Sequence, residues 1–276
     1  MNNLKIGFIG AGNMARSLIG GLIASGLPAD NIQASAPDRE HLDTLANDFG
    51  IQTSTDNQLL VDHCDVLVLA VKPQILKQVC LALQPRQDCL YLSVVAGIPT
   101  ASISHWLKQK TETAPLAIIR AMPNTPALLQ TGASALYANA HASEAQRESA
   151  EAIMRAVGLA LWVEDEAQMD AVTALSGSGP AYHFLFMEAM INAAQELGLN
   201  EANARLLTIQ TAFGAAKMAL EIDEQPATLR RNVTSPGGTT ERAIETFQQG
   251  GFEKLVAAAL SAACDRAGEL AEELGK

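Results

Sequence analysis

A glycine-rich turn near the beginning of the chain has the residue types that hold a pyrophosphate. Gly10, Gly12 and Ala15 form a Gly-x-Gly-x-x-Ala pattern between an apolar run and a helical pattern. Gly10 permits a tight turn, Gly12 lets the backbone approach the phosphates, and Ala15 keeps the helix close to a sheet. Free N–H groups at a helix N-terminus then bind the anion. We expect a dinucleotide to contact Gly10, Ala11, Gly12, Asn13, Met14 and Ala15.

The expected end of the second strand indicates which nicotinamide dinucleotide is bound. An acidic side chain there accepts hydrogen bonds from the ribose hydroxyls of NAD. In this chain Ser35 offers a hydroxyl and Arg39 a cation, which favours the additional phosphate of NADP, although Asp38 lies between them. The alternative is that Arg39 is a solvated surface charge. The sequence predicts NADPH as the cofactor, with NADH as the alternative.

Three further segments follow expected strands, where doubly wound sheets gather their ligands. Each is weak evidence alone, because turns after strands commonly use glycine and proline. We expect cofactor contacts from Ala70, Val71, Lys72, Pro73, Ala96, Gly97, Met122, Pro123 and Asn124.

Two glycine-rich segments later in the chain add hydroxyl groups and backbone donors. Residues 175–182 contain Ser176 and Ser178, each flanked by glycine, and residues 235–240 read Ser-Pro-Gly-Gly-Thr-Thr. A nucleophilic serine is one interpretation, but no histidine base is suggested beside either serine. Close approach of the backbone to a ligand is the better explanation.

The elements that position these segments are predicted from hydrophobic patterns. Apolar runs alternate with helical patterns through residues 1–163, as in strands joined by crossover helices over a parallel sheet. The expected strands are residues 5–9, 32–36, 66–71, 90–95, 117–121, 133–137 and 159–163. We therefore expect a doubly wound, Rossmann-type α/β domain for dinucleotide binding.

Alanine-rich helical patterns replace the strands over residues 164–276, which predicts a second, all-α domain. Pro180 suits the first turn of a helix that ends near Gly198, and Asn200 can cap the next helix. Residues 235–240 interrupt the helices, a helical pattern resumes at 241–245, and a last helix is expected over 252–274. The apolar faces can pack within the chain or against a second subunit.

Composition excludes several classes of partner. The 276 residues carry 30 acidic and 19 basic side chains, a net charge of −11 that opposes adhesion to nucleic acid or anionic lipid. The start of the chain has no cationic leader, and no long apolar segment follows, so we expect a cytoplasmic protein. The four cysteines and five histidines are scattered and lack metal-ligand spacing, so no metal site is predicted.

Together these segments resemble the pyrroline-5-carboxylate reductase family, and the resemblance covers essentially the whole chain. Its most specific parts are residues 170–182 and 232–240. The resemblance implies that a hydride passes from NAD(P)H to the carbon of a cyclic imine, 1-pyrroline-5-carboxylate, to give L-proline. It also implies that the helical domain forms a homodimer, which can assemble further into a decamer.

The resemblance assigns roles to individual residues. Asn57, Val71, Lys72, Ala96 and Asn124 should line the cofactor. Glu166 and Asn232 should lie near the substrate or the nicotinamide. The other residues expected at the substrate are Ser176, Gly237, Gly238, Thr239 and Thr240. The last four can hold the substrate carboxylate at a helix start. The Thr240 hydroxyl is the candidate proton donor to nitrogen, and a bound water is the alternative. The alternatives are a surface cation for Lys72, a solvated acid for Glu166 and a turn cap for Asn232.

Two other classes of protein share the dinucleotide-binding turn. Hydroxyacid dehydrogenases resemble one another in placing a lysine on the helix after the domain junction, and here no lysine lies between Pro180 and Lys217. That absence argues against alcohol oxidation. A dinucleotide-sensing module without catalysis would explain the turn at Gly10 but not the segment at residues 235–240.

Overall fold

The computed structural model describes residues 4–109 and 115–276, and the chain divides into two compact units. The first unit comprises Met1–Ser178 and Ala262–Lys276, and the second Gly179–Ser261. Residues 1–3, at the expected leader-free start, lie outside the described part. The domain boundary expected between residues 163 and 164 lies just after the last strand. The position of this boundary stays a prediction.

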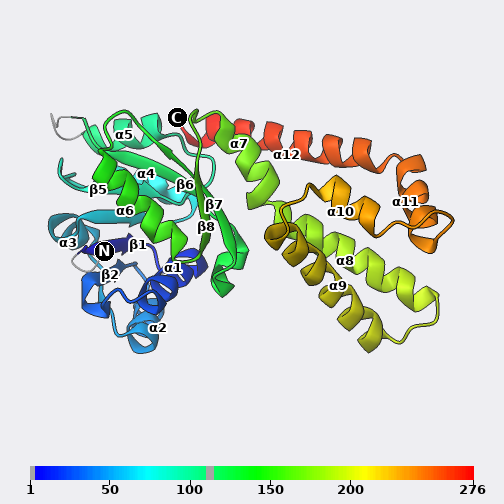
Figure 1. The fold of residues 1–276 in the computed structure, drawn as a ribbon. Coiled ribbons are helices and arrows are strands. Elements are labelled where there is room, and N and C mark those ends of the chain that lie inside the picture. Colours follow the sequence, from blue (N-terminus) through cyan, green and yellow to red (C-terminus); the bar gives the residue numbers. More distant parts are fainter. Residues whose placement is uncertain (1–3, 110–114) are drawn as a thin grey trace. The chain divides into compact units, whose positions relative to one another are not determined.

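The first unit is built on an eight-stranded sheet in the order β3-β2-β1-β4-β5-β6-β7-β8 (Figure 1). Its strands are β1 (Ile6–Ile9), β2 (Ile32–Ser35), β3 (Gln52–Ser54), β4 (Val66–Leu69), β5 (Leu90–Ser93), β6 (Ile118–Met122), β7 (Gly132–Ala138) and β8 (Gly158–Trp162). All seven expected strands are confirmed, with ends shifted by one or two residues. Strand β3 was not predicted, because it is short, polar and half-exposed at the sheet edge.

Helices cover both faces of this sheet. They are α1 (Asn13–Ala24), α2 (Arg39–Phe49), α3 (Asn57–His63), α4 (Pro73–Ala82), α5 (Thr100–Lys108), α6 (Glu144–Arg155) and α7 (Gln168–Val172), with the 3-10 turns η1 (Ala29–Asn31) and η2 (Thr125–Leu129) and the π-helix η3 (Thr173–Gly177). Successive strand residues face opposite sides: Val68 packs with the cluster under α1, α2 and α6, and Leu67 with the cluster under α3, α4 and α5. This two-sided burial confirms the doubly wound class.

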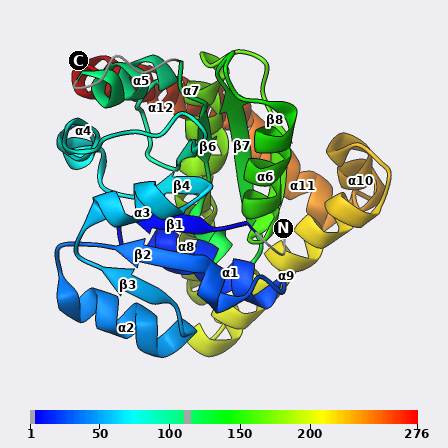
Figure 2. The same ribbon diagram turned by 90° about the vertical axis from the view of Figure 1, so that its left-hand side faces the viewer.

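The sheet is not wholly parallel, which corrects the expectation of a parallel sheet throughout. Strands β6 and β7 pair antiparallel, with Met122 opposite Ala135, and lie side by side in Figure 2. The connection between them contains only η2. A crossover between parallel strands needs about a dozen residues or more, so this shorter connection reverses the chain.

The second unit is helical in all its regular structure, as expected. It contains α8 (Gly179–Glu196), α9 (Glu201–Glu221), α10 (Pro226–Asn232), α11 (Thr239–Gln249) and the first part of α12 (Phe252–Leu274). Asn200 caps α9 as predicted, since its Oδ1 accepts from Asn203 N at 2.9 Å. Helix α10 was not predicted, and α11 begins two residues before the expected 241. Within the described residues, no helix is long and apolar enough to cross a membrane.

The end of α12 belongs to the first unit. Ser102 Oγ in α5 donates to the carbonyl oxygen of Gly275 at 2.6 Å, and Lys77 Nζ in α4 donates to that of Lys276 at 2.7 Å. Figure 1 shows this end of the chain beside α5. A helix that begins in the helical unit therefore ends against the dinucleotide-binding unit.

Candidate active site

The carboxyl ends of six parallel strands bring the expected cofactor segments to one edge of the sheet. Strands β1 to β6 all run in the same direction. The loops that follow β1, β2, β4, β5 and β6 therefore lie at one edge, and they hold nearly all the residues expected at the cofactor. This is the edge at which open α/β sheets bind ligands.

The turn after β1 has the geometry that its sequence predicts. Gly10 adopts φ +112°, and a Cβ there would collide with the carbonyl of Ala70, so only glycine fits. Its N–H donates to the carbonyl oxygen of Ser35 at 2.8 Å, which ties the turn to β2. Ala15 is fully buried on the inner face of α1. The turn is therefore fixed by contacts within the chain.

The amino end of α1 is open to a ligand. Gly12 is the N-cap residue, and among the described residues no side chain caps the helix. A Cβ built on Gly12 meets no atom of the described chain within 4 Å. Ala11 and Met14 are half-buried, whereas Asn13 is exposed. The first N–H groups of α1 are thus available to an anion, as a pyrophosphate site requires.

Ser35 is buried, and its hydroxyl is already engaged. Its Oγ donates to Asn57 Oδ1 at 2.7 Å, and the residue has no exposed surface in the described chain. With its oxygen occupied in this way, the half-buried Asn57 amide keeps its N–H groups for another acceptor. Ser35 and Asn57, both expected at the cofactor, therefore lie together, with Asn57 as the outer of the two.

Asp38 and Arg39 follow β2, and they differ in whether their side chains are already hydrogen-bonded. Asp38 caps α2, because its Oδ1 accepts from Glu40 N at 3.0 Å, and its Oδ2 lies 2.8 Å from His41 Nδ1. The His41 and backbone hydrogen bonds lower the pKa of this carboxyl. Arg39 is exposed, and in the described part of the chain its guanidinium forms no hydrogen bond or ion pair. The Asp38 carboxylate is engaged by hydrogen bonds from residues of α2, whereas the Arg39 guanidinium is available to bind a phosphate.

The loops after β4 and β5 also present backbone at this edge. Ala70, Val71 and Pro73 are half-buried, and the exposed Lys72 is the N-cap residue of α4, without a side-chain cap from any described residue. After β5, Ala96 is half-buried and Gly97 is buried with φ +76°. A Cβ on Gly97 would touch Leu270 and Ala271 in the last turns of α12, both at 3.8 Å or slightly more.

Asn124 joins the loop after β6 to the π-helix. Its Nδ2 donates to the carbonyl oxygen of Ser176 at 3.1 Å, and its Oδ1 accepts from Ala133 N at 2.9 Å. A Cβ on Gly177 would collide with the Met122 side chain. Pro123 is buried, and Ser176 Oγ donates to the carbonyl oxygen of Val172 at 3.0 Å. The structure thus brings together Asn124 and Ser176, which were expected at cofactor and substrate respectively.

Glu166 and Asp170 are half-buried carboxylates that face the buried Arg120, and sequence reasoning missed this cluster. Its Oε1 accepts from Thr100 N at 2.7 Å, and its Oε2 from Thr100 Oγ1 at 2.8 Å. Arg120 Nη1 lies 3.6 Å from Glu166 Oε1, and Arg120 Nη2 lies 3.9 Å from Asp170 Oδ1. Burial lowers the pKa of Arg120, against the raising effect of the two carboxylates. The signal in the sequence was an arginine inside the apolar strand 117–121.

The remaining expected residues lie in the helical unit. Asn232 is exposed and its Nδ2 donates to Glu224 Oε2 at 3.0 Å. Gly237 adopts φ +71°, and its N–H donates to Glu241 Oε2 at 2.7 Å. Gly238 is the N-cap residue of α11, followed by the exposed Thr239 and the half-buried Thr240. These residues form a helix start with several polar donors.

The four cysteines are free, and three are buried. Burial raises the pKa of Cys64 to about 11 and the pKa values of Cys80 and Cys89 to about 12. These thiols stay protonated near neutral pH, which is unfavourable for a nucleophile or metal ligand. Residues 4–109 and 115–276 contain no group of three or more His, Cys, Asp or Glu placed to hold a metal ion.

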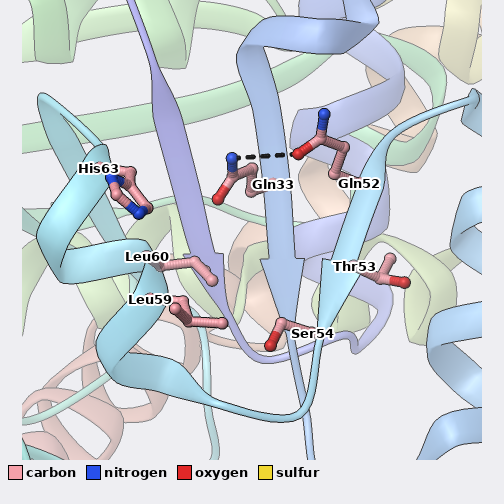
Figure 3. A pocket seen from close by; sticks show the side chains of 7 residues that line it. All are labelled: Gln33, Gln52, Thr53, Ser54, Leu59, Leu60 and His63. Atoms are coloured by element: carbon pink, nitrogen blue, oxygen red, sulfur yellow. Dashed lines mark hydrogen bonds between the residues drawn. The ribbon is translucent and has the colours of Figure 1, made fainter.

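A cavity of about 330 Å³ lies elsewhere, between α3, the edge strand β3 and its neighbour β2 (Figure 3). Its lining residues are Gln33, Gln52, Thr53, Ser54, Leu59, Leu60 and His63, none of which was expected at a site. Gln33 Nε2 donates to Gln52 Oε1 at 3.4 Å across it. The loops at the carboxyl edge of the sheet, rather than this cavity, carry the candidate chemistry.

Two protein-family models match the chain. The model described as NADP oxidoreductase coenzyme F420-dependent matches residues 5–97, and that described as pyrroline-5-carboxylate reductase dimerisation matches residues 166–270. The first match includes the turn after β1 and the loops after β2, β4 and β5. The second includes the π-helix and the start of α11.

Relatives of known name match over the full chain. The chain is 55% identical to pyrroline-5-carboxylate reductase of Pseudomonas aeruginosa over 278 residues, covering 100% of each protein. It is 44% identical to pyrroline-5-carboxylate reductase of Vibrio alginolyticus, covering 98% of each. The fold is similar to that of a pyrroline-5-carboxylate reductase from Coxiella burnetii, with TM-score 0.91, 45% identity and coverage of 98% and 99%. It is also similar to that of Plasmodium falciparum pyrroline carboxylate reductase with NADP bound, with TM-score 0.85, 28% identity and the same coverage.

Proposed function

The chain belongs to the pyrroline-5-carboxylate reductase family, and we propose from its geometry how its residues perform the reaction. It is an NAD(P)H-dependent oxidoreductase that reduces 1-pyrroline-5-carboxylate to L-proline, the final step of proline biosynthesis. The observation that supports cofactor binding is the amino end of α1, which no side chain of the described residues caps and which lies at the carboxyl edge of the sheet. A Cβ on Gly12 would meet no atom of the described chain within 4 Å, so the approach of a pyrophosphate to the first N–H groups of α1 is open.

NADPH is the cofactor favoured by the end of β2. Arg39 offers an unengaged guanidinium, and Asn57 offers amide N–H groups held in place by the Ser35 hydroxyl. Both suit the additional phosphate of NADP. The acidic group that would favour the ribose of NAD is Asp38, and its carboxylate is occupied in capping α2.

Reduction of the imine requires a hydride at carbon and a proton at nitrogen. The bound cofactor supplies the hydride, and the electron pair of the C=N bond moves to nitrogen. Thr240 is the candidate proton donor, since no hydrogen bond engages its hydroxyl in the described chain and it lies in the first turn of α11. The N–H groups and hydroxyls of residues 237–240 hold the substrate carboxylate beside it.

Assembly into a homodimer is supported by the surface of the helical unit. Many large apolar side chains are exposed there, in numbers that indicate a protein interface. They include Phe184, Leu185, Phe186, Leu197, Leu206, Leu207, Phe213, Leu220, Val233 and Leu255. The dimerisation model covers the same part of the chain. Further assembly into a decamer and a cytoplasmic location complete the proposal, and light scattering of the active enzyme tests the assembly.

A turnover assay separates this function from its two rivals. Purified protein is mixed with 1-pyrroline-5-carboxylate and NADPH, then NADH, and loss of reduced-nicotinamide absorbance is followed. A hydroxyacid dehydrogenase would instead reduce NADP⁺ or NAD⁺ with a hydroxy acid and leave the imine untouched. A binding module would bind NADPH without consuming it. If the absorbance falls with neither NADPH nor NADH, the result contradicts the assignment.

A further inference from the structure

Arg120 is a buried cation in the middle of an apolar strand. It is 3% exposed, and the residues on either side of it in β6, Ile119 and Ala121, belong to the hydrophobic core. Burying a charge in this way is unfavourable unless it is paired. Its Nη2 is buried and has no hydrogen-bond partner among the described residues, so the fold tolerates an incompletely paired guanidinium. A buried charge paired in this way is weak evidence for stability, so any role in positioning depends on the contacts that it makes.

Arg120 forms an ion pair with Glu166, and Glu166 accepts hydrogen bonds from the first residue of α5. Both carboxylate oxygens of Glu166 accept from Thr100, one from its N–H at 2.7 Å and one from its Oγ1 at 2.8 Å. The N-cap residue of α5 is Pro99, which provides no side-chain cap in the described structure. Glu166 therefore replaces the missing cap from a distant part of the chain. It fixes the end of the loop that contains Ala96 and Gly97.

Arg120 also lies in β6, two residues before the end of that strand at Met122. The loop that follows β6 contains Asn124, which contacts the π-helix through its hydrogen bond to the Ser176 carbonyl oxygen at 3.1 Å. Asp170, the second carboxylate facing Arg120, lies in α7, which runs directly into this π-helix. One guanidinium therefore links two loops at the carboxyl edge of the sheet.

Both loops lie on the nicotinamide side of the sheet. The strand order β3-β2-β1-β4-β5-β6 reverses between β1 and β4, where a dinucleotide crosses the sheet edge. The additional phosphate of NADP is assigned to the end of β2, so the adenosine half lies over β1 to β3. The nicotinamide half then lies over β4 to β6, at the loops that Arg120 links.

We propose that Arg120 is a positioning residue for the nicotinamide half of NADPH and acts through the Glu166 carboxylate that caps α5. It touches neither the cofactor nor the substrate. The inference rests on the proposed function, since it needs the loops at Ala96 and Asn124 to contact the nicotinamide. It assigns Glu166, expected near the substrate or the nicotinamide, to support of a cofactor loop.

Binding of two ligands distinguishes a role in positioning the nicotinamide from a general effect on the stability of the fold. NADPH and 2′-phospho-ADP-ribose share the adenosine half and the pyrophosphate, and only NADPH carries nicotinamide. Glu166→Gln, Thr100→Val and Arg120→Lys are titrated with both ligands by calorimetry. We expect the Kd for NADPH to rise about ten-fold and the Kd for 2′-phospho-ADP-ribose to stay within about two-fold, because only the nicotinamide contacts are lost.

Glu151→Gln is the matched control. Glu151 is likewise a half-buried, ion-paired glutamate, with Arg155 at 2.7 Å and Trp162 Nε1 at 2.7 Å, but it lies on α6 away from both loops. This variant should bind both ligands as the wild type does. Thr100→Val leaves both charged groups in place, so it remains informative if the Arg120 variant does not fold.

Equal weakening of both ligands, or unchanged NADPH binding in Glu166→Gln and Thr100→Val, would overturn the proposal. Turnover by the wild type is measured in the same preparation. An inactive wild type contradicts the proposed function itself. An active wild type whose variants bind NADPH normally contradicts only the role of Arg120.

Discussion

The carboxylate of Glu241 accepts a hydrogen bond from the backbone N–H of Gly237, with 2.7 Å between Oε2 and nitrogen. Glu241 lies in the first turn of α11, so its charge also faces the positive end of the helix dipole. Gly237 is one of the donors proposed for the substrate carboxylate. Under the proposed role of Gly237, the enzyme's own carboxylate occupies a position that the substrate needs, and the two anions compete.

Replacing Glu241 should therefore tighten substrate binding. In Glu241→Ala the competing charge is gone, and we expect the KM for 1-pyrroline-5-carboxylate to fall about three-fold, as for loss of one exposed charge-assisted contact. The matched control is Glu245→Gln on the same helix, where the carboxylate pairs with Arg242 at 3.2 Å. A KM that rises in Glu241→Ala would show that this carboxylate assists the substrate instead.

Thr240 and Thr239 should separate into different kinetic roles. Thr240→Val removes the proposed proton donor, so kcat should fall about a hundred-fold, the lower range for general acid catalysis, and Thr240→Ser should restore it. Thr239→Val should instead raise the KM for the imine, because it removes a carboxylate contact. Steady-state kinetics over a range of pH measure both. Full turnover and an unchanged pH profile in Thr240→Val would exclude Thr240 as the donor.

A substitution in the glycine turn should weaken NADPH binding without lowering the stability of the fold. Gly12 adopts φ −78°, and a Cβ there meets nothing in the described chain, so Gly12→Ala should unfold at the wild-type temperature. The same methyl group lies where the pyrophosphate approaches, so the Kd for NADPH should rise at least about ten-fold. Gly10→Ala is the contrast, since strain at its positive φ costs about 1–3 kcal/mol of stability. Normal NADPH binding by Gly12→Ala would place the pyrophosphate elsewhere.

Arg39 should determine the preference for NADPH over NADH. Arg39→Ala removes a charge-assisted contact to the additional phosphate, so the KM for NADPH should rise about ten-fold while that for NADH stays the same. Arg155→Ala makes the same change in net charge on α6, where Arg155 pairs with Glu151. An equal effect of both variants would mean that only the overall charge matters, and parallel losses with the two cofactors would remove Arg39 from the phosphate site.

Local features of the site were predictable from the sequence. The turn at Gly10 follows from glycine positions within six residues, and Asn200 caps α9 through a contact three residues along the chain. Strand β3 was missed because Gln52 and Thr53 show no apolar pattern. The reversal of β7 is encoded in the length of a connection rather than in any motif.

Contacts between distant residues were not predictable in this way. The sequence predicts Glu166 either near the substrate or nicotinamide or as a solvated acid, and its partners Thr100 and Arg120 are 66 and 46 positions away. A single sequence contains no signal that pairs a carboxylate with a hydroxyl at that separation. Asp38 shows the same limit at short range: its charge suggested ribose binding, whereas its neighbours His41 and Glu40 engage it as a helix cap.

Isotope transfer tests the central claim most directly. The protein is supplied with 1-pyrroline-5-carboxylate and NADPH that carries deuterium at the transferable position of the nicotinamide, and the product is examined by mass spectrometry and NMR. The account predicts L-proline with one deuterium on the ring carbon that was double-bonded to nitrogen. Unlabelled proline, or consumption of NADPH without proline, would contradict hydride transfer to the imine.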